Sequence, residues 1–238
     1  MVASAVAAAA VTLVGCAGTP AALLHGGTHG SGGAGHAGHS VSLPASGQHH
    51  ATLAIVSGAA SVIVTAVAMP GQLLRASTPA GSGLRPRLVA AGGRVQLFLD
   101  STGQGGPSVV TVEVSSAVSW QLQLSGGASQ SVLRLGSGKV SGIDFTAGSS
   151  LIQMTLPRPT GTPVITLAGG ASQVSLTVPD GVLARLQLDG GAGTARLAGV
   201  TRTGIASGTV LTEPGWSHAA NRYEIDAPAG VSDISVTG

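Results

Sequence analysis

The stretch QLQLSGGASQSVLRL, residues 121–135, decides the fold, because three later stretches repeat its pattern. These are GIDFTAGSSLIQMTL (142–156), VITLAGGASQVSLTV (164–178) and RLQLDGGAGTARLAG (185–199). One glycine in each copy serves as a reference, and the steps between them are 21, 22 and 21 residues: Gly127, Gly148, Gly170 and Gly191. Apolar residues stand five and three positions before it: Leu122 and Leu124, Ile143 and Phe145, Ile165 and Leu167, Leu186 and Leu188. Six positions after it stand Leu133, Met154, Leu176 and Leu197.

The spacing of these apolar columns predicts β-strands, because alternate residues of a strand share one face. A unit of this length with two strands and glycine-marked corners is typical of a β-solenoid, in which neighbouring coils bury each other's apolar face. Glycines at the corners suit tight turns and a close approach of successive coils. We therefore predict an all-β fold, a β-solenoid with coils of about 21–22 residues, over residues 51–238.

Residues 51–70, ATLAIVSGAASVIVTAVAMP, are apolar enough to be considered as a transmembrane helix. Ser57 and Gly58 interrupt this run, and apolar residues alternate on either side of the break. A hairpin of two strands is therefore predicted in place of a helix. Two further strands are predicted at residues 94–99 and 109–114.

The run of glycine-marked segments resembles the β-solenoid "toast-rack" domains of bacterial envelope proteins. The segments that carry the resemblance are SGGAS, GIDFTAG, LPRPTGTPVITLAGGAS, VPDGV, GGAG, GIASG and EPGW. Such domains occur in adhesin-like and envelope-stress proteins, and in actinobacterial lipoproteins or membrane proteins of unassigned function. The resemblance covers residues 51–238 and implies an extracytoplasmic interaction or scaffold module. The family offers no active-site residues to transfer to this chain.

The composition is that of an exported chain with few ionisable groups. Of 238 residues, 38 are glycine, only five are aromatic, and 20 carry a formal charge. Arginine outnumbers lysine ten to one, which is typical of a high-GC genome such as an actinobacterial one. The net charge of +2 is dispersed, without a run of basic residues, so we expect no binding to nucleic acid.

The only cysteine, Cys16, ends the N-terminal apolar segment. Residues 13–16, LVGC, resemble the lipobox of bacterial lipoproteins, in which the cysteine sulfur receives a diacylglyceryl group before cleavage. The apolar run of residues 5–13 has the length of a secretory signal and is too short to span a bilayer. We therefore predict a signal peptide in residues 1–15 and a lipid anchor on Cys16. The alternative is an ordinary cleaved leader with an incidental cysteine, since no Lys or Arg precedes the apolar run.

Residues 16–50 are rich in glycine and histidine and are predicted to form a flexible tether. Their imidazoles could ligate a transition metal, which leaves metal capture as an alternative function: His25, His29, His36, His39, His49 and His50. Their spacing is irregular, and no carboxylate joins them. We expect a solvated spacer without a specific metal site, and no cofactor.

Residues 51–238 show no clustering of the acids that a glycoside hydrolase or a lyase needs. The nine acids are scattered along the chain: Asp100, Glu113, Asp144, Asp180, Asp189, Glu213, Glu224, Asp226 and Asp233. Asp144 falls in an outward column with Gln123, Thr166 and Gln187. No paired carboxylates are therefore expected.

His218 is the only histidine beyond residue 50, and Ser217 and Asp226 could in principle complete a catalytic triad with it. Adjacent Ser and His side chains point apart in a strand or turn, so we expect a surface histidine instead. Trp120 and Trp216 could bind a sugar, but their positions near the start and after the end of the repeats favour covering the two ends of the core.

These observations predict a lipid-anchored, adhesin-like interaction or scaffold module on the outer face of the cytoplasmic membrane, without catalytic activity. The expected partners are the membrane, other envelope proteins and cell-wall glycan. The alternatives are a carbohydrate-active β-helix enzyme that acts on cell-wall glycan, and metal capture by the histidine tract. The sequence leaves the oligomeric state open.

The lipid anchor can be tested directly. Metabolic labelling with a fatty-acid probe should tag the wild-type chain, because Cys16 supplies the sulfur that is acylated. The Cys16→Ser variant should carry no label and should be released from membranes or remain unprocessed. An unlabelled wild-type chain would end the prediction.

Overall fold

The computed structural model describes residues 38–238, so Cys16, His25, His29 and His36 lie outside the described residues. The described chain contains nineteen strands and one short 3-10 helix, η1 (Trp216–His218). The predicted all-β class is confirmed. No helix in this part of the chain has the length and hydropathy needed to cross a membrane.

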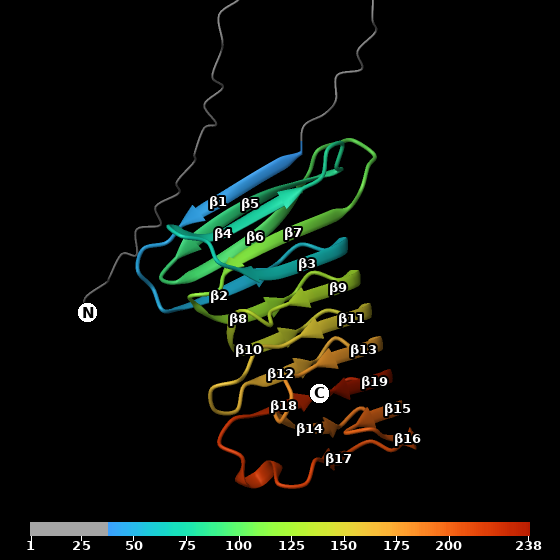
Figure 1. Ribbon diagram of the computed structural model, residues 1–238. Coiled ribbons are helices and arrows are strands. Elements are labelled where there is room, and N and C mark those ends of the chain that lie inside the picture. The colour runs from blue at the N-terminus through green and yellow to red at the C-terminus, as the bar shows by residue number, and fades with distance from the viewer. Residues whose placement is uncertain (1–37) are drawn as a thin grey trace, which may run out of the picture.

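The strands form two large sheets, A and B, which Figure 1 shows as a stack of rungs. In order, sheet A contains β1 (His39–Pro44), β4 (Gln72–Thr78), β7 (Val109–Ser115), β3 (Ala59–Val67), β9 (Ala128–Arg134), β11 (Ser149–Thr155), β13 (Ala171–Thr177), β19 (Val231–Thr237), β15 (Ala192–Leu197) and β16 (Val200–Ile205). Sheet B contains β17 (Thr209–Thr212), β14 (Leu183–Leu188), β18 (Arg222–Asp226), β12 (Val164–Leu167), β10 (Lys139–Phe145), β8 (Ser119–Leu124), β2 (His50–Ile55), β6 (Arg94–Ser101) and β5 (Leu84–Ala91).

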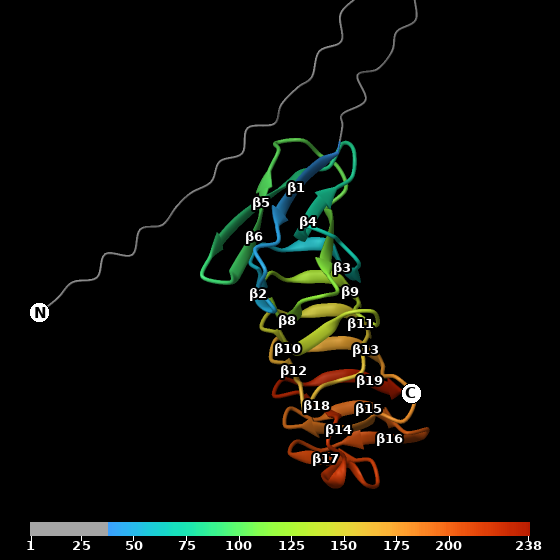
Figure 2. The same cartoon turned by 60° about the vertical axis from the view of Figure 1, so that its left-hand side comes forward.

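Seven pairs of consecutive strands each give one strand to sheet B and the next to sheet A: β2 and β3, β6 and β7, β8 and β9, β10 and β11, β12 and β13, β14 and β15, β18 and β19. These units are parallel and follow the same order in both sheets. The repeated apolar positions pair in register, since Ile143 lies beside Leu122 on one side and Ile165 on the other. Their side chains are buried between the sheets, which face each other in Figure 2.

Three of the seven units lie outside the 21- to 22-residue spacing, and two of these three carry the same pattern of apolar residues. Leu53 stands five positions before Gly58 and pairs with Leu122. Ile225 stands five positions before Gly230 and pairs with Ile165. The same pattern therefore extends to β2 and β3 at one end of the chain and to β18 and β19 at the other.

The last unit is not stacked in sequence order. β18 lies between β12 and β14, and β19 lies between β13 and β15, so residues 185–199 are not the direct neighbours of residues 164–178. After β15 the chain forms β16 and β17, which pair antiparallel with β15 and β14 and end the two sheets. It then returns through η1 and inserts its final unit.

Three predictions for the first part of the chain have different outcomes. The predicted strands at residues 94–99 and 109–114 are confirmed as β6 and β7. The predicted hairpin within residues 51–70 is wrong, because β2 and β3 belong to different sheets and pair with β8 and β9 instead. The predicted tether of residues 16–50 extends too far, because β1 pairs with β4 and packs Val41 and Leu43 against the core.

The two ends of the stack are closed differently. At the N-terminal end, edge strands β1 and β5 contact each other, and Pro86 leaves β5 one N–H short for pairing with another strand. At the C-terminal end, Arg202 of edge strand β16 pairs with Ala195, whose side chain faces the core. A charged residue that points inward on an edge strand opposes the addition of further strands.

The turns between the two strands of a unit bring neighbouring backbones into close contact. A Cβ atom added at Gly169 would lie 2.1 Å from the carbonyl carbon of Ala147, and one added at Gly126 would lie 2.2 Å from that of Ser57. Gly170 also has a φ angle of 72°, in the left-handed region. Close packing of successive turns therefore requires glycine at these corners.

The Gly169→Ala substitution should lower the free energy of unfolding by about 2 kcal/mol, because the backbone near Ala147 must move. A matched control is Gly105→Ala, since a Cβ atom at this loop position meets nothing within 4 Å. Its effect should stay within about 0.5 kcal/mol. Urea denaturation followed by circular dichroism measures both changes, and equal losses would contradict the packing argument.

Candidate functional site

Two rows of outward-facing side chains cross sheet B. The strand register aligns the first row as Gln96, Ala54, Gln123, Asp144, Thr166, Asp226, Gln187 and Val210. It aligns the second row as Arg94, Thr52, Gln121, Gly142, Val164, Glu224, Arg185 and Thr212. The column expected from the sequence is present, except that the inserted β18 places Asp226 between Thr166 and Gln187.

Side chains of these rows bind one another across the strands. Arg94 donates a hydrogen bond to Oε1 of Gln123 over 2.9 Å, and Gln121 donates one to Oδ2 of Asp144 over 2.9 Å. Gly142 provides room for Gln121, because a Cβ atom there would lie 2.5 Å from Oε1 of that glutamine. Hydrogen bonds between strands therefore link the polar side chains on the outer surface of sheet B.

Three carboxylates gather toward the C-terminal end of this surface: Asp189, Glu224 and Asp226. Glu224 forms an ion pair with Arg185, whereas Oδ1 of Asp226 is buried and accepts no hydrogen bond from any residue that the structure describes. Burial raises the pKa of Asp226 above its ordinary value, the charges of Asp189 and Glu224 raise it further, and Arg185 lowers it. The expectation that no carboxylates come together was wrong, because β18 inserts beside β14.

Trp216 is held between side chains next to this cluster. The guanidinium carbons of Arg185 and Arg222 lie 4.5 and 4.3 Å from the centre of its ring. Its indole N–H donates a hydrogen bond to the carbonyl oxygen of Tyr223 over 2.8 Å. The side chain is buried, so its ring is not available as a platform for a sugar.

Trp120 lies inside the core, in the middle of sheet B. Its indole N–H donates to the carbonyl oxygen of Ser115 over 2.9 Å. The expectation that Trp120 covers one end of the core is therefore wrong, because β2, β6 and β5 continue the sheet beyond β8. Trp216 does lie beside β14, the last strand but one of sheet B at the C-terminal end.

The histidines form no catalytic or metal-binding cluster in the described chain. His218 is exposed in η1, and no hydrogen bond joins it to Ser217 or Asp226 within residues 38–238. His39 begins β1, His50 begins β2, and His49 directly precedes it. No group of three or more His, Cys, Asp or Glu side chains in this part of the chain could hold a metal ion.

The outer surface of sheet A carries an uncharged polar patch, which we call the neutral face. It consists of two in-register rows on β11, β13 and β19: Gln153, Ser175 and Ser235, and Thr155, Thr177 and Thr237. Neighbouring strands lie about 4.8 Å apart, and alternate residues along a strand lie about 6.7 Å apart. The neutral face therefore presents hydroxyl and amide groups as a regular grid.

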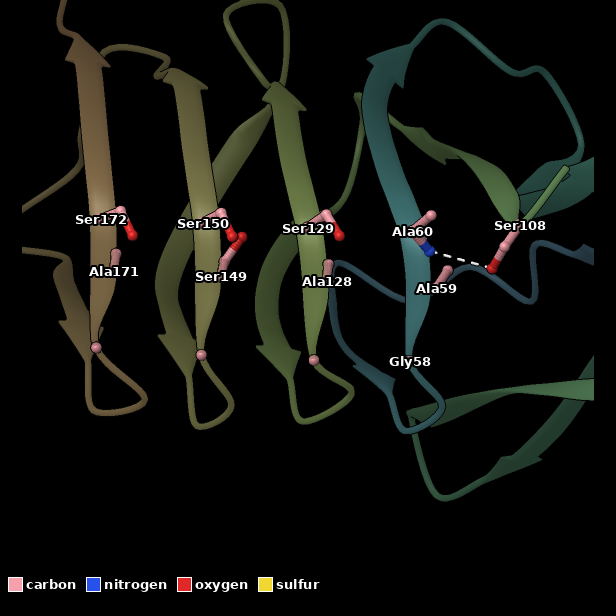
Figure 3. A pocket seen from close by; sticks show the side chains of 13 residues that line it. Gly58, Ala59, Ala60, Ser108, Ala128, Ser129, Ser149, Ser150, Ala171 and Ser172 are labelled. Carbon is pink, nitrogen blue, oxygen red and sulfur yellow. Dashed lines mark hydrogen bonds between the residues drawn. The ribbon is translucent and has the colours of Figure 1, made fainter.

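A shallow groove follows the glycine corners, where successive strands of sheet A begin. Figure 3 shows Ser129, Ser150 and Ser172 at equivalent positions of three successive units, with their hydroxyl groups along the groove. At its N-terminal end, the hydroxyl oxygen of Ser108 accepts a hydrogen bond from the N–H of Ala60 over 3.1 Å. The side chains of the groove are small, so an extended ligand could approach the backbone.

The sequence matches no protein-family model and no curated protein. The fold is similar to that of a proposed cell adhesion protein from Clostridium sporogenes, with a TM-score of 0.59 and 11% sequence identity. That alignment covers 84% of this chain and 98% of the other. A proposed adhesin from Bacteroides fragilis aligns over 84% of this chain and 95% of its own, with 8% identity and a TM-score of only 0.22. The first likeness shows a shared fold.

Asp226 should make the stability of the protein depend on pH. A carboxyl group whose pKa is raised in the folded state stabilises the fold less as the pH rises above its unfolded value. The Asp226→Asn variant should therefore melt about 1–2 °C above wild type at pH 7, and this gain should vanish as the pH falls toward 4. Asp233→Asn, on sheet A, is the control, and a pH-independent difference for Asp226→Asn would contradict the interpretation.

Proposed function

We propose that the chain is an extracytoplasmic, lipid-anchored, adhesin-like module of the bacterial envelope, built as a β-solenoid and without catalytic activity. The observation that carries the proposal is the neutral face, where three adjacent strands present matching Thr, Ser and Gln side chains. The shared fold with the Clostridium sporogenes protein, whose name refers to cell adhesion, supports the same role.

The repeated grid fits a ligand that is itself repetitive. A polysaccharide carries hydroxyl and amide groups at regular intervals, and it can lie extended across successive strands. Each hydrogen bond to such a ligand replaces one to water and contributes little alone, about 1 kcal/mol. Affinity therefore depends on several rungs binding together, and we propose cell-wall glycan as the ligand class.

The proposed anchor orients the module. The described chain begins beside β1, at the end of the stack opposite β16 and β17 (Figure 1). A lipid on Cys16 would leave the 21 residues from 17 to 37 between the membrane and the described part of the chain. The N-terminal end of the stack would then face the membrane, with the neutral face to one side.

A second candidate function is glycan cleavage, because Asp189, Glu224 and Asp226 lie close enough for their charges to interact. Two features favour binding over cleavage. The cluster lies on the outer surface of a sheet, where water is not excluded, and Glu224 is already neutralised by Arg185. A glycosidase instead needs an acid and a base on opposite sides of one sugar bond.

Co-sedimentation with purified, insoluble cell-wall glycan tests the proposal, using the full chain with Cys16→Ser to avoid aggregation through lipid. Thr177→Arg places a bulky charge in the middle of the neutral face and should reduce the bound fraction at least about tenfold, since several rungs lose contact at once. Gln104→Arg, in an exposed loop, is the matched control and should bind as wild type does.

Failure of the wild-type chain to sediment with the glycan would overturn the proposed ligand. Undiminished binding by Thr177→Arg would exclude the neutral face as the site. The supernatant is assayed for released reducing ends as well. If wild type releases reducing ends and the Asp189→Ala and Asp226→Ala variants do not, the function is glycan cleavage.

A further inference from the structure

The outer surface of sheet B carries unpaired charges of opposite sign toward its two ends. Within residues 38–238, the ion pairs within 4.0 Å are Arg75–Glu113, Arg87–Asp100 and Arg185–Glu224. Arg94, on β6, is exposed to solvent and has no carboxylate partner within residues 38–238. Among the described residues, Asp144 near the middle and Asp189 and Asp226 toward the other end form no ion pair within 4.0 Å.

Most side chains in the middle of this surface are short. Thr52 and Ala54 on β2, Gly142 on β10, and Val164 and Thr166 on β12 occupy five of the eight outward positions there, and the other three hold Gln121, Gln123 and Asp144. Val164 is 39% exposed, an unusual position for an apolar side chain in the middle of a sheet. Surfaces of this kind can pack closely against another flat surface.

We propose that the outer surface of sheet B binds a second copy of the chain, related by a two-fold axis that runs along the strands between β8 and β10. Three strands on one side of the axis, β8, β2 and β6, then lie over β10, β12 and β18 of the partner. A two-fold contact of this kind uses the same surface on both copies, so each favourable pair occurs twice.

The register determines which residues meet across this interface. Arg94 and Glu224 share the second row, so Arg94 lies over the Glu224 and Asp226 end of β18 in the partner. Val164 lies over Thr52, which covers its exposed methyl groups. Asp144 lies over Gln123, an amide that can donate to its carboxylate.

Three arguments favour a second copy over a different partner. The complementary charges are on one surface, which makes that surface complementary to itself. Both copies have the same spacing between strands, so the side chains of facing strands stay aligned across the whole interface. Asp226, which lies near Asp189, Glu224 and Arg185, gains Arg94 of the second copy as a further cationic neighbour. The inference does not depend on glycan binding, because the dimer leaves the neutral face of sheet A open on both copies.

Sedimentation equilibrium of the full chain with Cys16→Ser tests the dimer by charge reversal. Wild type should show a monomer–dimer equilibrium that weakens as salt is raised, because exposed charges are screened. Arg94→Glu and Asp226→Arg should each raise the dimer dissociation constant at least about tenfold, since each places like charges together twice. An equimolar mixture of the two variants should form a one-to-one heterodimer, because opposite charges then face each other at both positions.

Arg134→Glu, on sheet A, is the matched control and should dimerise as wild type does. If Asp226→Arg does not fold, as judged by its melting curve, Glu224→Arg, which the register places opposite Arg94 of the second copy, replaces it in the mixture. A wild-type chain that stays monomeric at low salt would overturn the proposal, and so would a mixture that stays monomeric. Retained glycan binding by Arg94→Glu would separate this result from the proposed function of the neutral face.

Discussion

The close approach of successive backbone turns at the glycine corners is the constraint on which the whole architecture depends. At Gly126 and Gly169 even a methyl group would overlap a neighbouring backbone, so each turn fixes the position of the next. Because the turns are fixed, the strands that leave them are in register, and apolar side chains such as Ile143 and Ile165 meet in continuous columns. Leu, Val and Ile fill most of this narrow core, and the larger Trp120 and Tyr223 also lie in it. The same geometry explains why the outward side chains also align in rows, since a parallel register that orders one face of a sheet orders the other.

Much of the strand arrangement could be predicted from the sequence, because most units show the same spacing of glycine and apolar residues. The units around Gly58 and Gly230 show this pattern too. They lie outside the regular step, because Gly58 is 69 residues before Gly127 and Gly230 is 39 residues after Gly191. Nothing in the sequence of the last unit indicates that it enters the stack between β12 and β14, since every unit offers the same apolar columns to its neighbours. The sequence pattern therefore predicts the strands within each unit, but it does not predict the order in which the units stack.

The candidate carboxylate cluster shows the consequence of that ambiguity. Asp189 and Asp226 are 37 positions apart, and the units that carry them are not separated by the regular step of 21 to 22 residues. They come together only because β18 is inserted beside β14. The prediction that Trp120 covers an end of the core fails for a similar reason. The regular repeats begin near this residue, but β2, β6 and β5 extend sheet B beyond it. The outward row of Gln123, Asp144 and Thr166 was predictable, because it lies within three units that are consecutive in both sequence and space.

A stack built in this way restricts the kinds of function that it can support. Side chains facing the core are limited to sizes that fit between two closely spaced sheets, and corner residues are limited to those that allow the turns to touch. Chemical variety is left to the outward rows, which differ between the two sheets: sheet B combines Arg94 with Asp144 and Asp226, whereas the neutral face on sheet A carries only Thr, Ser and Gln. A charged surface discriminates between partners through complementary and like charges, while an uncharged grid binds through many weak contacts repeated at a fixed spacing. The two faces are therefore suited to different partners, and occupation of one leaves the other free, so that a pair of copies joined through sheet B would present two neutral faces and gain from binding a polymeric ligand at both.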